Sequence, residues 1–227
     1  MENKPFAMGF RIEHPQQMVE NAQYGPYAYD QRLPRASYRL THQSKEMGAD
    51  GKNRGVYTFC MCPGGYVVNA SSEEDRLCVN GMSYHDRGGT NANSAVLTTL
   101  PVEGLAEDLF SGMNYQTEIE REAFRLGGGN YNAPVQRVKD FLEGRPSTKL
   151  GAIEPTIKPG YRLTDLSKLY PSSVTTALRE SLLTWGRKIS GFSQDDAILT
   201  GVEARSSSPI RILRDDNFES LTMKGLY

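Results

Sequence analysis

The chain has 227 residues, a formal net charge of −1 and an isoelectric point near 6.3. This length suits one large domain or two small ones, with a core that needs no disulfide support. The near-neutral charge gives no reason to expect nucleic acid or an anionic membrane as a partner. No apolar run approaches the length of a bilayer span.

Three cysteines are too few for a secreted disulfide framework. The N-terminus, Met1-Glu2-Asn3-Lys4-Pro5, is not followed by an apolar signal segment. We therefore expect a cytoplasmic protein with reduced thiols.

The first part of the chain alternates between extended and irregular patterns. Residues 6–13 predict a strand, and the next six residues, 16–21, predict one or two helical turns. Residues 24–37 read as a loop and residues 37–42 as a short strand. The polar, glycine-rich residues 43–55 predict a turn or mobile loop.

A β meander is expected next. Four segments rich in β-branched and aromatic residues predict strands, at residues 55–61, 66–69, 76–80 and 94–101. The polar residues 83–93 form a connection between the last two.

The middle of the chain is helical in character. Apolar residues in 104–126 approach helical spacing, and the glycine run 127–129 ends that segment. Residues 134–142 predict a second helix, with Pro134 in its first turn. The proline- and glycine-rich residues 144–162 read as a long connection.

The remaining elements complete a mixed pattern. Residues 163–169 predict a short helical piece and residues 172–189 a longer helix capped by serine. Strands are expected at residues 195–203 and 210–213. Together these elements predict an α+β fold, with a mixed or antiparallel β core and an inserted helical subdomain at about 104–192.

The dinucleotide and phosphate fingerprints are missing. The sequence has no G-x-G-x-x-G after a strand and no G-x-x-x-x-G-K-[ST]. The glycine run 127–129 follows a predicted helix instead of preceding one, so a helix stop is the better reading.

Several stretches together resemble one family. They are PFAMGFRIEHPQ (5–16), GVYTFCMCPGGYVVNASSE (55–73), VNGMSYHDR…NANSA (79–95), APVQRVKDFLEG (133–144) and ILTGVEARSSSPIRILRD (198–215). The sequences and order of these stretches resemble those of the large, poorly characterised bacterial FAD-dependent dehydrogenases. These are relatives of the glutathione-reductase-type NAD(P)/FAD-dependent flavoproteins. The resemblance extends over nearly the whole chain.

The resemblance implies a piece of a larger two-domain FAD-binding fold, truncated at both ends. In that family the adenine-dinucleotide fingerprint lies upstream, and a Gly-Glu-Gly-rich flavin-contacting motif follows downstream. The implied division is a β-rich substrate or cap region at 1–103, a helical subdomain at 104–192, and strands returning to the FAD domain at 193–227.

The implied function is the substrate-side portion of an FAD-dependent oxidoreductase, which forms the pocket over the flavin. Its partners would be the missing FAD-binding domain of the same parent chain, a small organic substrate and NAD(P)H as a co-substrate. The piece alone should hold FAD poorly and be inactive, because the pyrophosphate site is missing. A non-catalytic ligand-binding or protein-interaction domain is the alternative.

Cys60 and Cys62 are the first candidate site residues, as a thiol pair near the flavin. A Cys-x-x-Cys at a helix start would be a stronger redox signal, so a structural role for one or both thiols stays open. Gly64 and Gly65, in the turn after Pro63, permit close approach to a cofactor, or they simply close a hairpin.

The resemblance also points to the strand that contains Gly201 and Val202 and to Arg205 beyond it. This strand would place backbone N–H groups against the flavin ring, and Arg205 would offset negative charge on a reduced flavin or pair with an anionic substrate. An exposed arginine in a turn is the alternative interpretation of Arg205.

His85 is a candidate general acid or base on a polar loop, although a solvated turn is the commoner role for such a residue. A zinc-stabilised module built from Cys60, Cys62, Cys78 and His85 is a less favoured alternative, because one intervening residue is a cramped spacing for two thiolates on one metal. We predict no metal. The loop tyrosines 24, 27 and 29 could stack on an aromatic ligand or anchor their loop.

Overall fold

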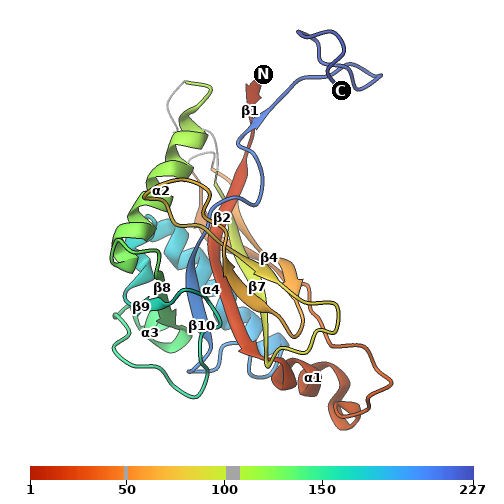
Figure 1. Ribbon diagram of the computed structural model, residues 1–227, viewed down its shortest axis with the longest axis vertical. Coiled ribbons are helices and arrows are strands. Elements are labelled where there is room, and N and C mark those ends of the chain that lie inside the picture. The colour runs from red at the N-terminus through yellow and green to blue at the C-terminus, as the bar shows by residue number, and fades with distance from the viewer. Residues whose placement is uncertain (49–50, 101–107) are drawn as a thin grey trace.

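The computed structural model describes residues 1–48, 51–100 and 108–227, and one seven-stranded sheet lies at its centre (Figure 1). The strand order is β3–β4–β7–β2–β10–β8–β9. Neighbouring strands are antiparallel except β8 and β9, which run parallel. The strands are β2 (Phe6–Pro15), β3 (Thr41–Met47), β4 (Asn53–Cys62), β7 (Asn91–Leu100), β8 (Ala133–Arg137), β9 (Tyr161–Leu163) and β10 (Ile198–Glu203).

Two small sheets and several helices surround the central sheet. The small sheets are the hairpin of β5 (Tyr66–Asn69) and β6 (Val79–Met82), and the pair of β1 (Glu2–Asn3) and β11 (Ile210–Arg211). The helices are α1 (Gln16–Tyr24), α2 (Ser111–Gly127), α3 (Val138–Glu143) and α4 (Ser172–Lys188), with short 3-10 turns η1 (Gly25–Tyr27) and η2 (Leu166–Leu169). In the described residues no helix is long and apolar enough to cross a membrane.

The central sheet has a different layer on each of its two faces, and β2 contributes side chains to both. Strand β2 pairs with β7 along its whole length, from Phe6 opposite Leu100 to Pro15 opposite Asn91. Successive side chains of a strand point to opposite faces, so an apolar set alternates with a second set that holds two charges. The first set is Phe6, Met8, Phe10 and Ile12, and the second is Ala7, Gly9, Arg11 and Glu13.

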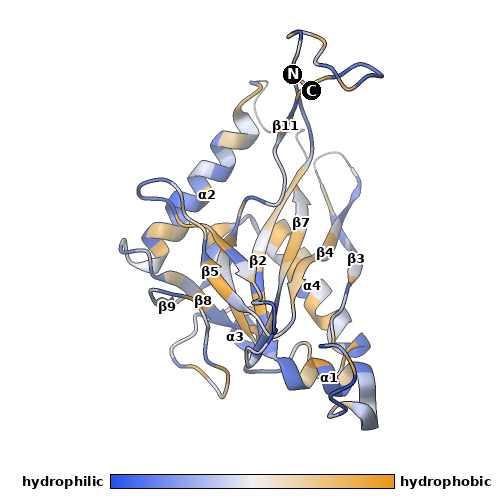
Figure 2. Ribbon diagram, turned by 45° about the vertical axis from the view of Figure 1, so that its right-hand side comes forward, coloured by the Kyte–Doolittle hydropathy of each residue, from blue (hydrophilic) through white to orange (hydrophobic). Residues whose placement is uncertain are grey.

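The apolar set of β2 faces the helices. The ring of Phe10 lies 5.7 Å from that of Phe141 in α3 and 5.4 Å from that of Tyr170. Helix α4 packs on β3, β4 and β7 and contributes Leu178 and Trp185 to the same core. Each large side chain buried here contributes about 2 kcal/mol from the removal of apolar surface from water. Figure 2 shows the hydrophobic residues concentrated in the strands of the central sheet.

The opposite face of the sheet is covered by the β5–β6 hairpin. Strand β6 contacts β2, β4, β7 and β10, so the hairpin lies across the centre of the sheet. Val67 N–H donates to Thr156 Oγ1 at 2.8 Å, which ties the hairpin to the long connection after α3. The charged residues of β2 therefore lie between two layers of backbone.

Most of the predicted elements are confirmed. The strand at 66–69 is β5, the strand at 6–13 lies within β2, and the helix at 172–189 is α4. The helix expected at 104–126 begins at Ser111, and residues 104–107 of that prediction lie outside the described residues. The α+β class, with a mixed and mostly antiparallel sheet, is confirmed.

The turn or mobile loop predicted at residues 43–55 was wrong for residues 43–47 and 53–55, and residues 49–50 of that prediction lie outside the described residues. Strand β3 continues to Met47, and β4 begins at Asn53. Because β3 is an edge strand with mostly solvent-exposed side chains, its polar composition is compatible with a ladder to β4.

The helix predicted at 134–142 was wrong in its first half. Residues 133–137 form β8, and only Val138–Glu143 is helical. The β8–β10 ladder starts at Val135, so the missing N–H of Pro134 lies beyond that ladder. The segment 104–192 therefore contributes β8 and β9 to the central sheet as well as helices, and its boundary as a subdomain stays a prediction.

Both ends of the chain leave the body at the same end of the sheet (Figure 1). Glu2 and Asn3 pair with Arg211 and Ile210, and Lys4 N–H donates to the Pro209 carbonyl at 2.9 Å. Beyond β11 the chain extends away from the body and exposes large apolar side chains: Phe218, Leu221, Met223 and Tyr227.

Candidate functional site

Arg11 is fully buried at the centre of the sheet, and each of its three guanidinium nitrogens donates a hydrogen bond. Its Nη1 donates to both carboxylate oxygens of Glu203 in β10, at 2.9 and 2.7 Å. Its Nε donates to Asn93 Oδ1 in β7 at 2.8 Å, and its Nη2 donates to the Cys60 carbonyl at 2.5 Å. The guanidinium is thereby fixed by three strands besides its own.

The Arg11–Glu203 pair holds two opposite charges in a site without solvent. Burial raises the pKa of Glu203, and the charge of Arg11 and its hydrogen bond act in the opposite direction. A buried ion pair of this kind is a weak source of net stability, although removal of one partner strands the other charge. The pair therefore acts mainly to fix the position of the guanidinium.

The two thiols of β4 lie beside this guanidinium. Arg11 Nη2 is 3.4 Å from Cys62 Sγ, and Cys62 Sγ is 3.3 Å from the carbonyl oxygen of Cys60. Cys60 is exposed and Cys62 is partly buried, and neither forms a disulfide. Burial is the main cause that raises the pKa of the Cys60 thiol.

A β-bulge produces this arrangement. Phe59 pairs with Ala95 and Cys62 pairs with Asn93, so β4 has one residue more than β7 in this interval. Cys60 has a φ of 43°, a left-handed conformation that glycine usually adopts at such a bulge. The bulge releases Cys60 from the ladder and leaves Cys62 paired with β7.

Glycines of the covering hairpin approach the thiol–arginine cluster closely. A Cβ on Gly81 would lie 2.0 Å from Arg11 Nη2 and 2.2 Å from Asn93 Oδ1. A Cβ on Gly65 would lie 2.9 Å from that of Cys62. These positions have room for glycine alone, which is why the hairpin can close over the guanidinium.

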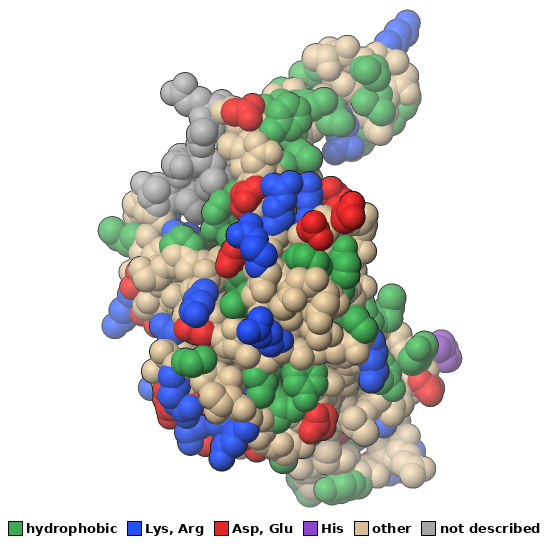
Figure 3. All heavy atoms as spheres, turned by 60° about the vertical axis from the view of Figure 1, so that its left-hand side comes forward, with side chains coloured by type: hydrophobic (Ala, Val, Ile, Leu, Met, Phe, Trp, Pro, Cys, Tyr) green, Lys and Arg blue, Asp and Glu red, His purple; other side chains and the backbone are tan. Residues whose placement is uncertain are grey.

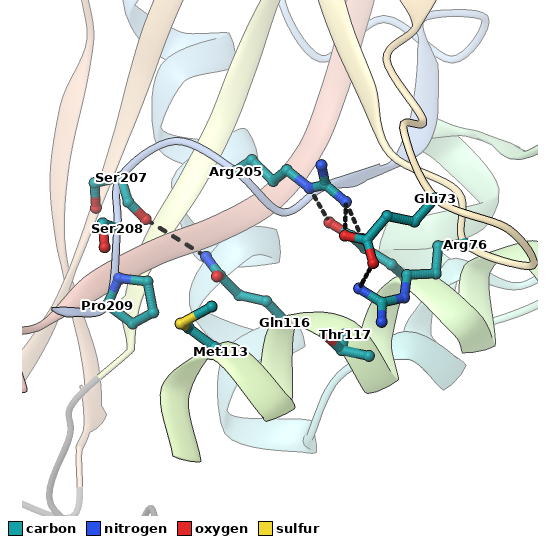
Figure 4. Close-up of a pocket in the computed structure, with 10 residues that line it drawn as sticks. Glu73, Arg76, Met113, Gln116, Thr117, Arg205, Ser207, Ser208 and Pro209 are labelled. Carbon is teal, nitrogen blue, oxygen red and sulfur yellow. Dashed lines mark hydrogen bonds and ion pairs between the residues drawn. The ribbon is translucent and has the colours of Figure 1, made fainter. Parts of the chain in front are cut away.

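Arg205 lies apart from the Arg11 cluster and lines a cavity of about 360 Å³ (Figure 4). This cavity is at the end of the sheet where both ends of the chain leave the body. Arg205 Nε and Nη2 each donate to Glu120 at 2.7 Å, and its Nη1 donates to Ser72 Oγ at 2.6 Å. The hydrogen bond to Glu120 raises the pKa of Arg205 further above its usual value. Glu73 bridges Arg205 and Arg76 by ion pairs of 3.5 and 2.6 Å, so the two cations face two carboxylates.

The surface around this cavity has no single sign of charge. Figure 3, which brings the α2 side forward, shows basic and acidic side chains interspersed over the face. The cavity also has an apolar wall from Met113 and Pro209. This combination suits a ligand with one apolar and one polar part better than a bare anion.

The predicted cofactor glycines lie in packed positions. A Cβ on Gly64, where φ is 51°, would lie 1.8 Å from the Arg87 carbonyl oxygen. A Cβ on Gly201 would lie 3.1 Å from methyl carbons of Leu166 and Leu169, and Val202 is fully buried. Gly201, Val202 and Arg205 follow one another along β10 and the segment after it, while Gly64 and Gly65 follow Cys62 in the connection between β4 and β5, which do not pair.

His85 lies elsewhere, in another cavity of about 600 Å³. It shares this cavity with Tyr29, Asp30 and Arg35, which belong to the tyrosine-containing loop after α1. The structure therefore brings His85 and one of the loop tyrosines together, but it separates His85 from the two thiols of β4.

Cys78 is also separate from the exposed thiols. It is buried, and burial raises its pKa to about 11. No group of three or more His, Cys, Asp or Glu side chains in the described part of the chain is placed to hold a metal ion. The four residues considered for zinc do not converge.

Sequence reasoning missed Arg11, Asn93, Gly81 and the pairing role of Glu203. A charge inside a strand whose neighbours are Phe10 and Ile12 was the available signal, because a buried charge requires a partner. Its partner lies 192 residues away, so the signal does not identify it.

The described residues do not supply a site for an adenine dinucleotide. A pyrophosphate needs a glycine turn that opens a helix, yet the glycines of 127–129 follow α2 and close it, with Gly128 in the left-handed region. The guanidinium of Arg205 is already bonded to Glu120 and Ser72.

Comparison with known proteins identifies the family of this chain. Residues 5–206 match the family described as FAD-dependent protein, C-terminal domain-like. An uncharacterised protein of Clostridium beijerinckii is 48% identical over 228 aligned residues, which are all of this chain and 42% of the relative. The chain thus spans less than half the length of that relative. By the match over residues 5–206, the chain belongs to the family of FAD-dependent protein C-terminal domains.

Proposed function

We propose that this chain is the substrate-side, or cap, portion of an FAD-dependent oxidoreductase. The family match over residues 5–206 is the observation that carries the proposal. A relative of which this chain makes up only 42% supports an FAD-binding part outside these 227 residues. That part would be the principal partner of the chain.

The end of the sheet where the chain leaves is the expected contact with that part. Strands β1 and β11 pair there, so the first and last segments of the chain lie side by side at this end. The cavity of Arg205 lies at this end, and its lining residues Ser207, Ser208 and Pro209 belong to the connection itself. An FAD-binding domain docked here would close the cavity from outside.

The flavin, when bound by the longer protein, supplies the exchange of a hydride or an electron pair. A small organic substrate and NAD(P)H are the proposed reaction partners. The chain contributes walls and charge to the cavity, with Arg205 in its lining, and Gly201 and Val202 precede Arg205 in the chain. We propose that the isolated chain is inactive, and we place the protein in the cytoplasm, where its free thiols stay reduced.

The coding sequence on both sides of these residues gives the first test. The longer protein and the 227-residue chain are produced in parallel, and FAD is measured in each by absorbance after release from the protein. We expect FAD in the longer protein, bleaching of its absorbance by NADH or NADPH without oxygen, and neither property in the chain.

Hydrogen exchange of the same two samples tests the docking end. Slower exchange of α2 and residues 204–211 in the longer protein supports the proposal, with β3 as the internal control that keeps its rate. A longer protein that lacks flavin and shows no change at this end overturns the oxidoreductase proposal. The non-catalytic binding domain would then be the better interpretation.

A further inference from the structure

We propose that Cys60 and Cys62 form a redox-active dithiol that exchanges with organic disulfides, in which Cys62 attacks and Cys60 resolves. The proposal goes beyond the flavin-dependent function and does not depend on it, because both half-reactions are thiol–disulfide exchange. It rests on the backbone geometry of the pair, on the charge beside Cys62, and on the access of solvent to Cys60.

The bulge is what makes the spacing suitable. Two residues of a regular strand span about 6.7 Å, near the upper limit of the Cα separation that a disulfide tolerates. The extra residue of β4 between Phe59 and Cys62, with Cys60 at a φ of 43°, breaks the extended geometry at this point. The pair is therefore not held at the separation of a regular strand.

Two hydrogen-bond donors, one of them charged, lie beside Cys62. Arg11 Nη2 lies 3.4 Å from Cys62 Sγ, and its orientation is fixed by Glu203 and Asn93. Asn93 is also the cross-strand partner of Cys62, and its buried Nδ2 has no acceptor in the described part of the chain. A second donor without a partner thus lies next to Cys62. A positive charge and hydrogen-bond donors activate a thiol by stabilising its anion.

The position of Cys60 suits the second step. Its side chain is exposed, and its carbonyl oxygen lies 3.3 Å from Cys62 Sγ, so the two residues are in direct contact. Burial raises the pKa of the Cys60 thiol. Because the Arg11 guanidinium contacts the sulfur of Cys62, we assign the first attack to Cys62. Cys78, buried and with a pKa of about 11, serves as an unreactive cysteine within the same chain.

The reaction balances without another cofactor. The Cys62 thiolate attacks one sulfur of R–S–S–R, the substrate S–S bond breaks, and the first RS⁻ leaves and takes up a proton. The Cys60 thiolate then attacks Cys62 Sγ, and the second RS⁻ leaves as RSH. The protein loses two electrons and two protons, and the disulfide becomes two thiols. A dithiol such as dithiothreitol reverses both steps.

The test uses the folded chain, without oxygen, and the aromatic disulfide dithiobis(nitrobenzoate). We expect release of two nitrothiobenzoate ions per chain, no adduct on the protein, and a Cys60–Cys62 disulfide in peptide mass spectra. Cys78 should react only after denaturation. Two retained adducts would show independent thiols, and an unreactive folded chain would show inaccessible ones. Either result overturns the proposal.

Two single variants assign the roles. Cys60→Ser should retain one adduct on Cys62, and Cys62→Ser should retain one on Cys60 at a rate about tenfold lower. Cys78→Ala is the matched control and should keep the wild-type stoichiometry. Equal rates, or a faster Cys60, would overturn the assignment of Cys62 as the attacking thiol.

Discussion

At the scale of single residues, Cys60 occupies a backbone conformation that is unfavourable for any residue with a Cβ. Its φ of 43° is left-handed, and the side chain is exposed, so packing does not compensate. We predict that Cys60→Gly raises the free energy of unfolding by about 1 kcal/mol, because glycine adopts this conformation without strain. Urea denaturation measures the change.

The neighbouring Met61 provides the control for that substitution. Met61 has an ordinary strand conformation and packs partly against the core, so Met61→Gly should lower stability by about 1–2 kcal/mol. If Cys60→Gly also destabilises the chain, the backbone of Cys60 is not strained in the folded protein. If Cys60→Gly stabilises the chain and abolishes the thiol exchange, the cysteine is needed for the exchange and not for the stability of the bulge.

His14 makes stability depend on pH. It is fully buried, its Nε2 is 2.5 Å from the Phe192 carbonyl oxygen, and burial lowers its pKa from 6.5 to about 4. The unfolded chain takes up a proton near pH 6.5, whereas the folded chain does so only near pH 4. Stability is therefore lost as the pH falls through this window, by up to about 3 kcal/mol from His14.

The difference between two pH profiles isolates this contribution. His14→Gln keeps an N–H donor for Phe192 but cannot titrate, so its stability should fall less than that of the wild type between pH 7 and pH 4. The exposed His85 is the control, and His85→Gln should reproduce the wild-type profile. Parallel profiles for wild type and His14→Gln would contradict the prediction.

At the scale of elements, the β5–β6 hairpin and the Arg11 cluster depend on one close approach. A Cβ on Gly81 would lie 2.0 Å from Arg11 Nη2, so it would displace the guanidinium and strain its ion pair with Glu203. We predict that Gly81→Ala destabilises the chain by about 1–3 kcal/mol. It should also slow the reaction of Cys62 with disulfides, because the displaced guanidinium no longer contacts its sulfur.

Gly55 in β4 is the matched control for this substitution. A Cβ there would meet only side-chain atoms at 3.7 Å or more, so Gly55→Ala should change stability by less than about 0.5 kcal/mol. Thermal denaturation of both variants gives the comparison. Equal stability of Gly81→Ala and Gly55→Ala would mean that Gly81 does not pack closely against Arg11.

At the scale of the whole molecule, the sequence predicts elements better than it predicts their neighbours. Strands such as β5 and helices such as α4 follow from local periodicity, because each buries one face. The position of β8 between β10 and β9 does not, because it depends on pairing with residues 28 positions away in β9 and 61 to 65 positions away in β10. Local helical preference was outweighed there by two strand partners.

The same limit applies to the candidate site. The spacing of Cys60 and Cys62 marks them in the sequence, and Arg205 stands out through the family resemblance. The partners that define their chemistry come from distant segments: Arg11 for the thiols and Glu120 for Arg205. A sequence shows which residues carry chemistry, but the charge beside them emerges only when β2, β4 and β10 form one sheet.

The chain beyond β11 extends away from the body, so the fold should not require it (Figure 2). We predict that removal of residues 212–227 changes the melting temperature by less than about 2 °C, because the described contacts of this segment are mainly internal. Removal of residues 204–227 should lower it by about 5 °C or more, because the Arg205–Glu120 pair and the Ser206 hydrogen bond to Ala7 are also lost. Scanning calorimetry distinguishes the two truncations. Unfolding of the shorter deletion would show that the apolar tail, with Phe218 and Leu221, packs on the body in solution.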